Sequence, residues 1–204
     1  MHKLYGFINT KGEEIIEPKF KFVSNFQEGL AQVEIIQNNF LFINKTGENI
    51  FSIKCDEASS LENGYVIFKK NNKYGVINKK GEEIIKCNYD KIKSFMNGVF
   101  AVNLDGKCGI INEKGEEIIE CEFQEVKDLN KGKFCGKYEN KWGLYDLDGS
   151  CYIENNFSET KYIGSFLDNY AAMTNGKWEI IDCWGNIKST NNYISINNFY
   201  SDFS

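Results

Sequence analysis

Three glutamate doublets stand out as side chains in this sequence that could do chemistry. Two carboxylates on either side of a bond are what glycoside hydrolysis needs. Neighbouring residues of a strand point to opposite faces, so the two members of a doublet cannot converge on one substrate. We interpret the doublets as solvated strand residues, which stacked repeats would align into an acidic ridge that could attract a basic partner. They are Glu13-Glu14, Glu82-Glu83 and Glu116-Glu117.

Other catalytic constellations are also missing from the sequence. His2 is the only histidine, which excludes histidine-based acid–base and triad chemistry. The seven cysteines form no CxxC pair, and most occupy positions that other repeats fill with different residues, so we interpret them as reduced core thiols. The turn glycines are followed by strands and not by helices, so they do not form a phosphate cradle. We expect no enzyme, no cofactor and no metal site.

The elements around these residues repeat with a nearly fixed period. Glycines recur at intervals of 34 to 36 residues, and a mostly aromatic column precedes each glycine by seven residues. A period of 20 to 50 residues is typical of repeat architectures. The glycines are Gly12, Gly47, Gly81, Gly115, Gly149 and Gly185. The column contains Tyr5, Phe40, Tyr74, Cys108, Trp142 and Trp178.

One repeat contains a β-hairpin followed by a further strand. Residues 5–9 are aromatic and β-branched, which predicts a strand, and Asn9 to Gly12 then has turn composition. Residues 30–35 alternate apolar and polar side chains, which predicts a half-buried strand. The Asn or Asp that starts every turn could be mistaken for a ligand ladder, but these residues are the ones that cap such turns. The segment 89–94 could be a strand or a short helical turn.

These motifs resemble the WG-repeat (KWG-repeat) family of largely bacterial proteins. Lys141–Asp146 matches the Lys-Trp-Gly strand of the family best, and Lys73–Asn78 is a close variant. Ile15–Pro18 and Phe26–Val33 match the later part of the pattern. Leu41 and Glu179 depart from it in the glycine column, and Cys108 departs in the aromatic column. The resemblance implies an all-β repeat module, usually presumed to bind other molecules, with no common catalytic residues.

The predicted fold class is therefore all-β, built from tandem β-hairpin or meander repeats of about 34 residues. We expect one repeat domain over residues 1–204. An open, solenoid-like array is favoured because unit six is degenerate and no strand follows it to close a ring; a β-propeller-like ring is the alternative. The units are about 4–38, 39–72, 73–106, 107–140, 141–176 and a partial unit 177–198.

Composition limits the partners. The net charge is −5, and no run of lysine or arginine forms a basic face, so nucleic acid and anionic membrane are poor partners. No stretch approaches the roughly 18 apolar residues of a membrane span, and the start lacks the apolar region of a signal peptide. We expect a cytoplasmic protein, and the oligomeric state is left open.

The function predicted from the sequence is a non-catalytic binding or scaffold module that presents a repeated β surface to a protein or peptide. The alternative is a carbohydrate or cell-envelope binding module that uses exposed aromatic residues, although the aromatic column is also what a repeated core position would contain. Function is expected where the repeats vary, at the turn tips and on the exposed face of the last strand of the repeat. Trp184 at one tip has no role supplied by the repeat. The candidate partner-binding residues are Trp184, Lys79, Lys80, Trp142 and Trp178.

Overall fold

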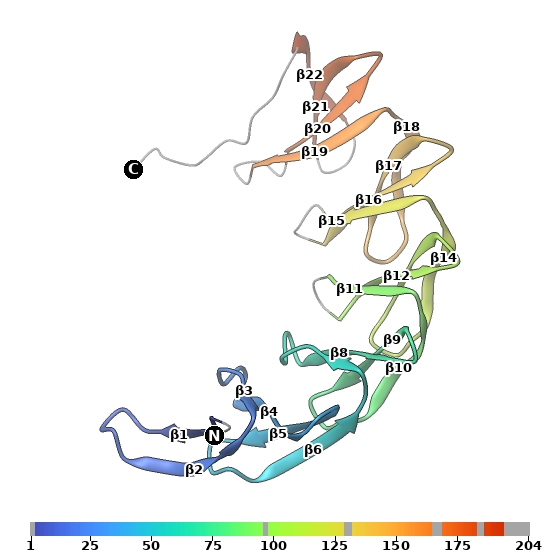
Figure 1. Ribbon diagram of the computed structural model, residues 1–204. Helices are drawn as coiled ribbons and strands as arrows, with labels where there is room; N and C mark the ends of the chain where they lie inside the picture. Colours follow the sequence, from blue (N-terminus) through green and yellow to red (C-terminus); the bar gives the residue numbers. More distant parts are fainter. Residues whose placement is uncertain (1–2, 96–97, 129–131, 165–168, 183–185, 194–204) are drawn as a thin grey trace. The chain divides into compact units, whose positions relative to one another are not determined.

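The computed structural model describes residues 3–95, 98–128, 132–164, 169–182 and 186–193, and these residues form β-strands and turns (Figure 1). The prediction of an all-β chain of tandem repeats is confirmed. Contacts divide the chain into two compact units. The first contains residues 1–92 and 113–115, and the second contains residues 93–112 and 116–204. The open array and the ring both stay predictions.

The first unit contains three antiparallel sheets. The N-terminal sheet has only two strands, β1 (Tyr5–Ile8) and β2 (Glu14–Phe20). The next sheet contains β3 (Phe22–Val23), β4 (Leu30–Ile36), β5 (Asn39–Asn44) and β6 (Asn49–Lys54). The third contains β7 (Glu57–Ala58), β8 (Tyr65–Lys70), β9 (Lys73–Asn78) and β10 (Glu83–Tyr89).

The remaining three sheets have four strands each, in the same sequential order. One contains β11 (Lys91–Ser94), β12 (Phe100–Leu104), β13 (Lys107–Ile111) and β14 (Glu117–Phe123). One contains β15 (Glu125–Asp128), β16 (Lys133–Tyr138), β17 (Lys141–Asp146) and β18 (Cys151–Phe157). The last contains β19 (Glu159–Gly164), β20 (Asn169–Thr174), β21 (Lys177–Ile181) and β22 (Ile187–Tyr193).

Each four-stranded sheet straddles two of the repeats that the sequence defines. Its first two strands come from the end of one repeat, and its last two are the aromatic strand and the return strand of the next. A second hairpin makes this junction, because β8 and β9 are joined at Asn71 and Asn72, whose φ angles are 53° and 63°. Positive φ at both central residues is the two-residue turn whose twist matches the strands that flank it. Lys91–Ser94 is a strand, which decides the segment that the sequence left open.

The cores lie between successive sheets. Ile16 and Phe20 of β2 pack with Ala31, Val33 and Ile43 of the following sheet. The next cluster follows the same pattern, and so do the clusters of the second unit. Within each unit, successive sheets therefore bury apolar side chains against one another, which is the nearest-neighbour packing of a repeat protein.

The glycine of the aromatic strand permits a close approach of the return strand. A Cβ atom on Gly6 would lie only 2.3 Å from the carbonyl oxygen of Ile16, where the register of β2 against β1 shifts. Where Leu41 replaces this glycine, β6 instead pairs with β5 in continuous register from Asn39 to Phe42. This departure from the repeat pattern therefore coincides with a local change of strand register, and the sheet is kept.

Candidate partner-binding surface at the hairpin tips

The hairpin tip between β9 and β10 is held by one asparagine. The Oδ1 atom of Asn78 accepts hydrogen bonds from the backbone N–H groups of Lys80 (2.9 Å) and Glu82 (3.1 Å). Its Nδ2 atom donates to Oε2 of Glu82 at 2.6 Å. Gly81 closes the turn with φ of +83°, and a Cβ atom there would lie 2.6 Å from that of Phe51, so the turn packs on β6 of the preceding sheet.

The same side-chain pair recurs at the equivalent tips. In four repeats the asparagine amide donates to the glutamate four residues later, at 2.6 to 3.1 Å. The last repeat exchanges the two partners, because the amide of Asn186 donates to Oδ2 of Asp182 at 3.1 Å. The first glutamate of each doublet therefore holds its own turn, while the predicted acidic ridge stays a prediction. The four pairs are Asn9–Glu13, Asn44–Glu48, Asn78–Glu82 and Asn112–Glu116.

The residues between the asparagine and the glycine vary and point outward. Lys79 and Lys80 are both exposed, and in the part of the chain described neither forms an ion pair. A hollow of about 300 Å³ adjoins them, lined also by Glu28, Gly64 and Tyr65. These residues come from three different repeats of the first unit, so only the fold brings them together.

Specific hydrogen bonds fix the wall of this hollow. Oε1 of Glu28 accepts the backbone N–H of Gly64 at 2.9 Å, which links the equivalent loops of two successive repeats. The hydroxyl of Tyr65 donates to Oε2 of Glu113 at 2.5 Å. Burial, together with this hydrogen bond and the charge of Glu113, raises the pKa of the Tyr65 phenol to about 12. At neutral pH the phenol is therefore protonated, and it keeps donating to the carboxylate.

The two tryptophans of the aromatic column are buried, whereas Tyr5 of the same column is exposed. Trp142 is 3% exposed and Trp178 is 7% exposed, and both belong to hydrophobic core clusters. The ring of Trp142 is also covered by a cation, because Nζ of Lys127 lies 4.2 Å from its centroid. The two indoles therefore offer little surface to a ligand. Trp184, the remaining aromatic candidate, lies outside the described residues.

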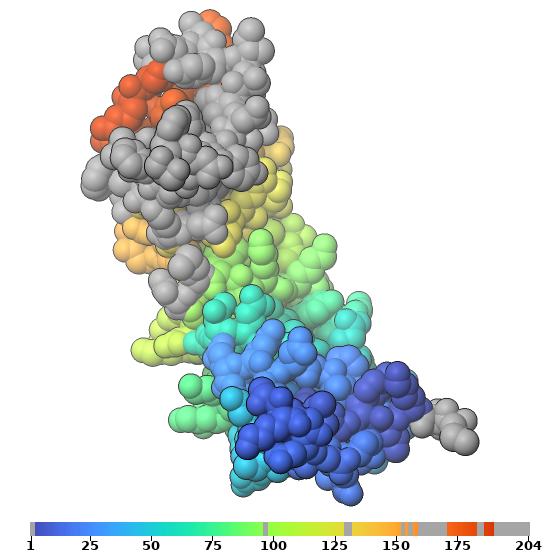
Figure 2. Space-filling model, turned by 90° about the vertical axis from the view of Figure 1, so that its left-hand side faces the viewer, coloured from blue at the N-terminus to red at the C-terminus, as the bar shows by residue number. Residues whose placement is uncertain are grey.

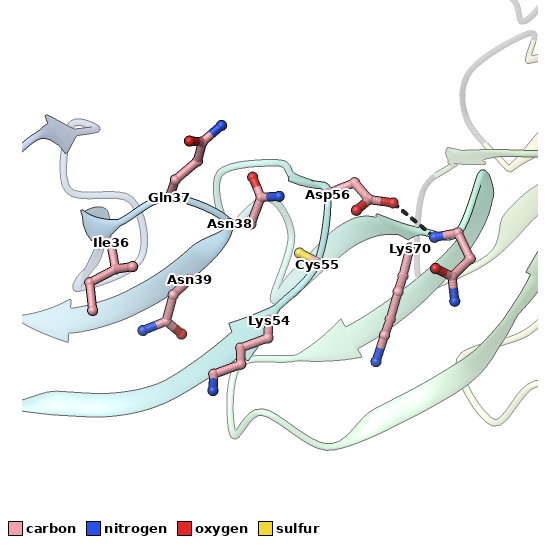
Figure 3. Close-up of a pocket in the computed structure, with 9 residues that line it drawn as sticks. Ile36, Gln37, Asn38, Asn39, Lys54, Cys55, Asp56 and Lys70 are labelled. Atoms are coloured by element: carbon pink, nitrogen blue, oxygen red, sulfur yellow. Dashed lines mark hydrogen bonds between the residues drawn. The ribbon is translucent and has the colours of Figure 1, made fainter.

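A second hollow, away from the tips, does not gather its polar groups at one point. It has a volume of about 480 Å³ and lies among the β4–β5 turn, the β6–β7 link and the β8–β9 turn. Figure 3 shows Lys54 and Lys70 pointing to one side of it and Gln37 to the other. Its acidic member, Asp56, already accepts the backbone N–H of Asn71 at 2.8 Å.

The thiols near this hollow are poorly suited to nucleophilic chemistry. Burial, followed by the charge of Asp56, raises the pKa of Cys55 to about 11. Burial also raises the pKa of Cys87, whose thiol donates to the carbonyl oxygen of Lys73 at 2.9 Å. Since the thiolate is the nucleophile, these shifts leave both sulfurs protonated near neutral pH.

The chain matches the family model of the WG-containing repeat over residues 5–38, 42–74, 74–108 and 109–142. It belongs to this family. These ranges cover well over half of the sequence and contain the four asparagine–glutamate tips and the hollow beside Lys79 and Lys80. Membership of this family therefore accounts for the repeated scaffold.

Solved structures are similar at low sequence identity. A structure titled as the eukaryotic initiation factor is 14% identical, with a TM-score of 0.51 over 88% of this chain and 56% of that one. Hsv2 of Kluyvelomyces marxianus is 11% identical, with a TM-score of 0.49 over 91% and 71% of the two chains. BamB of Moraxella catarrhalis is 10% identical, with a TM-score of 0.39 over 85% and 61%. The first likeness is one of fold alone.

No curated protein matches the sequence. Helices with the length and apolarity of a membrane span are absent from the described residues.

Proposed function

We propose that this WG-repeat protein is a non-catalytic binding module that presents its hairpin tips to a protein or peptide. The observation that carries the proposal is the tip geometry. Four tips share the same asparagine–glutamate bonding, while the outward residues between them differ. A constant scaffold with variable exposed positions is how repeat proteins build binding surfaces.

The lysine tip of the first unit indicates an acidic partner segment. Lys79 and Lys80 place two ammonium groups beside a hollow large enough for one or two side chains. Exposed charges of this kind change association rates and selectivity more than they change affinity. An acidic peptide would therefore be selected here by its charge, and binding should weaken as the salt concentration rises.

The proposal that the chain is not an enzyme rests on the second hollow and on the thiols near it. The polar groups of the hollow in Figure 3 do not converge, and the neighbouring thiols have raised pKa values. The carbohydrate alternative loses support, because Trp142 and Trp178 are buried. A cytoplasmic location remains part of the proposal.

Quantitative capture from lysate of the source cell tests the proposal. Lys79→Glu/Lys80→Glu reverses the tip charge, and it should reduce the captured partner at least tenfold. Lys86→Glu/Lys91→Glu makes the same change in net charge at two exposed positions away from the tip, and it should capture as much partner as the wild type. Equal losses in both variants, or none in either, would contradict a tip-specific site.

A further inference from the structure

β1 is the only aromatic strand in the described part of the chain that pairs on one edge alone. Its counterparts β5, β9, β13, β17 and β21 each lie between two strands, whereas β1 pairs only with β2. The backbone N–H and C=O groups on its other edge therefore have no strand partner among the described residues. Such an edge is a template for adding another strand.

β1 has the same kind of apolar side chains as the equivalent strands that have a neighbour on both edges. Ile8 is 70% exposed, yet its counterparts Ile43, Ile77, Ile111 and Ile181 are 0 to 3% exposed. In β9, the residue facing Ile77 is Val66 of β8, and that strand covers the position. Ile77 also packs with Phe42 and Phe51 of the preceding sheet. Ile8 is therefore exposed because β1 has neither a second neighbouring strand nor a preceding sheet among the described residues, and not because of a change of residue. Figure 2 shows the N-terminal segment, in dark blue, at the surface of the molecule.

β1 and β9 are nearly the same strand. Residues 5–9 and 74–78 differ at one position only, Phe7 against Val76. Their return strands also pair in the same register: Tyr5 faces Phe20 as Tyr74 faces Tyr89. The strand that β9 accepts on its other edge therefore fits β1 as well.

The contacts that β8 makes with β9 indicate which side chains a partner strand would place against the free edge of β1. The ring of Phe68 packs on Gly75, where an added Cβ atom would lie 2.8 Å from it, and β1 has Gly6 at that position. Nζ of Lys69 lies 5.5 Å from the centroid of the Tyr74 ring, so a lysine at this place in a partner strand would face Tyr5. Val66 faces Ile77 across the two strands, so a valine at this place in a partner strand would face Ile8.

We propose that the free edge of β1 binds an extended segment of a partner protein as an added antiparallel strand with the pattern Val-x-Phe-Lys. Main-chain hydrogen bonds would supply affinity, and the alternating side chains would supply selectivity. The interface continues one that the chain already makes between β8 and β9. The inference rests on the proposed function, since both make the chain a peptide-binding module, but it uses a different surface.

A labelled peptide of residues 64–71, which contains β8, tests the proposal by fluorescence anisotropy with the full chain. Binding is expected, and Phe68→Ala in the peptide should weaken it at least tenfold. In the protein, Ile8→Lys should weaken binding at least tenfold without unfolding, because Ile8 is exposed. Ile36→Lys replaces another exposed isoleucine, on β4, and should leave binding unchanged.

N-methylated peptides test the strand geometry itself. Alternate N–H groups of a strand point to opposite edges, so methylation of one alternate set should abolish binding and methylation of the other should not. Equal effects of the two sets, or no binding of the unmodified peptide, would overturn the proposal. A dimer that Ile8→Lys converts to a monomer would also overturn it, since a second copy would then occupy the edge.

These experiments distinguish a failure of the edge proposal from a failure of the proposed tip function. Lys79→Glu/Lys80→Glu should leave peptide binding at β1 intact. Loss of lysate capture in that variant, together with no binding of the β8 peptide, would refute the edge and leave the tip function standing. If the peptide binds but capture from lysate does not depend on the tip, the tip site is refuted and the edge proposal stands.

Discussion

Exchanging the asparagine–glutamate pair of one tip tests the reasoning about how the tips are held. The single change Asn78→Asp keeps the Oδ1 acceptor for the two backbone N–H groups, but it puts a carboxylate where an amide donates to Glu82 at 2.6 Å. The double change Asn78→Asp/Glu82→Asn restores a donor and an acceptor in the order that Asp182 and Asn186 already use in the last repeat.

The expected cost of the single change follows from two contributions. Loss of one hydrogen bond costs about 0.5–1.5 kcal/mol in the free energy of unfolding. Repulsion between two exposed charges about 4 Å apart adds about 1 kcal/mol in water. Asn78→Asp should therefore destabilise the protein by about 1.5–2.5 kcal/mol. The double variant should recover to within about 0.5 kcal/mol of the wild type, so the two positions are coupled.

Urea unfolding at pH 7 and low salt, followed by circular dichroism, measures this coupling. Repulsion raises the carboxyl pKa values in Asn78→Asp, so its penalty should shrink as the pH falls to about 4, where one carboxyl is protonated. It should also shrink in 1 M salt. The pairing would be refuted if the double variant lost as much stability as Asn78→Asp and Glu82→Asn lose together when each is measured alone.

Three further outcomes follow from burial and pKa. The pKa of Tyr65 is raised to about 12 from an unfolded value of about 10. The contribution of this shift to stability is therefore complete below pH 10 and is lost as the pH rises to 12. In Tyr65→Phe, the urea concentration at the unfolding midpoint should depend less on pH over this range than it does in the wild type. With Trp184→Phe, the emission of the remaining tryptophans should be blue-shifted and poorly quenched by iodide, since Trp142 is 3% exposed. Iodoacetamide should alkylate exposed Cys151 before buried Cys55, as mass spectrometry of timed samples would show.

Local signals were enough to predict the first hairpin of each repeat. Asn9 and Gly12 have the residue types that this turn requires, and the alternation in residues 30–35 correctly predicted strand β4. The half-buried pattern was wrong at Gln32, which is 4% exposed because its Nε2 atom donates to the carbonyl oxygen of Ala58 at 2.9 Å. The second hairpin was missed, and the predicted unit boundaries therefore cut through the sheets. A signal was present, because Asp105-Gly106 between two strands is typical of the two-residue turn that the structure has there.

The candidate site was predicted only in part. Lys79 and Lys80 could be placed at an exposed tip from their position in the repeat. The hollow beside them could not, because Glu28, Gly64 and Tyr65 belong to other repeats and meet only when sheets stack. The open edge of β1 was also invisible in sequence, since Tyr5 to Asn9 is nearly identical to a strand that has two neighbours.

Hydrogen–deuterium exchange with and without the captured partner tests the central claim most directly. If the partner binds the lysine tip, amides of residues 78–82 and of the loop at residues 62–65 should exchange more slowly in the complex. The same peptides of Lys79→Glu/Lys80→Glu should show no change. Protection confined to other segments, or equal protection in the variant, would contradict a partner site at the hairpin tips.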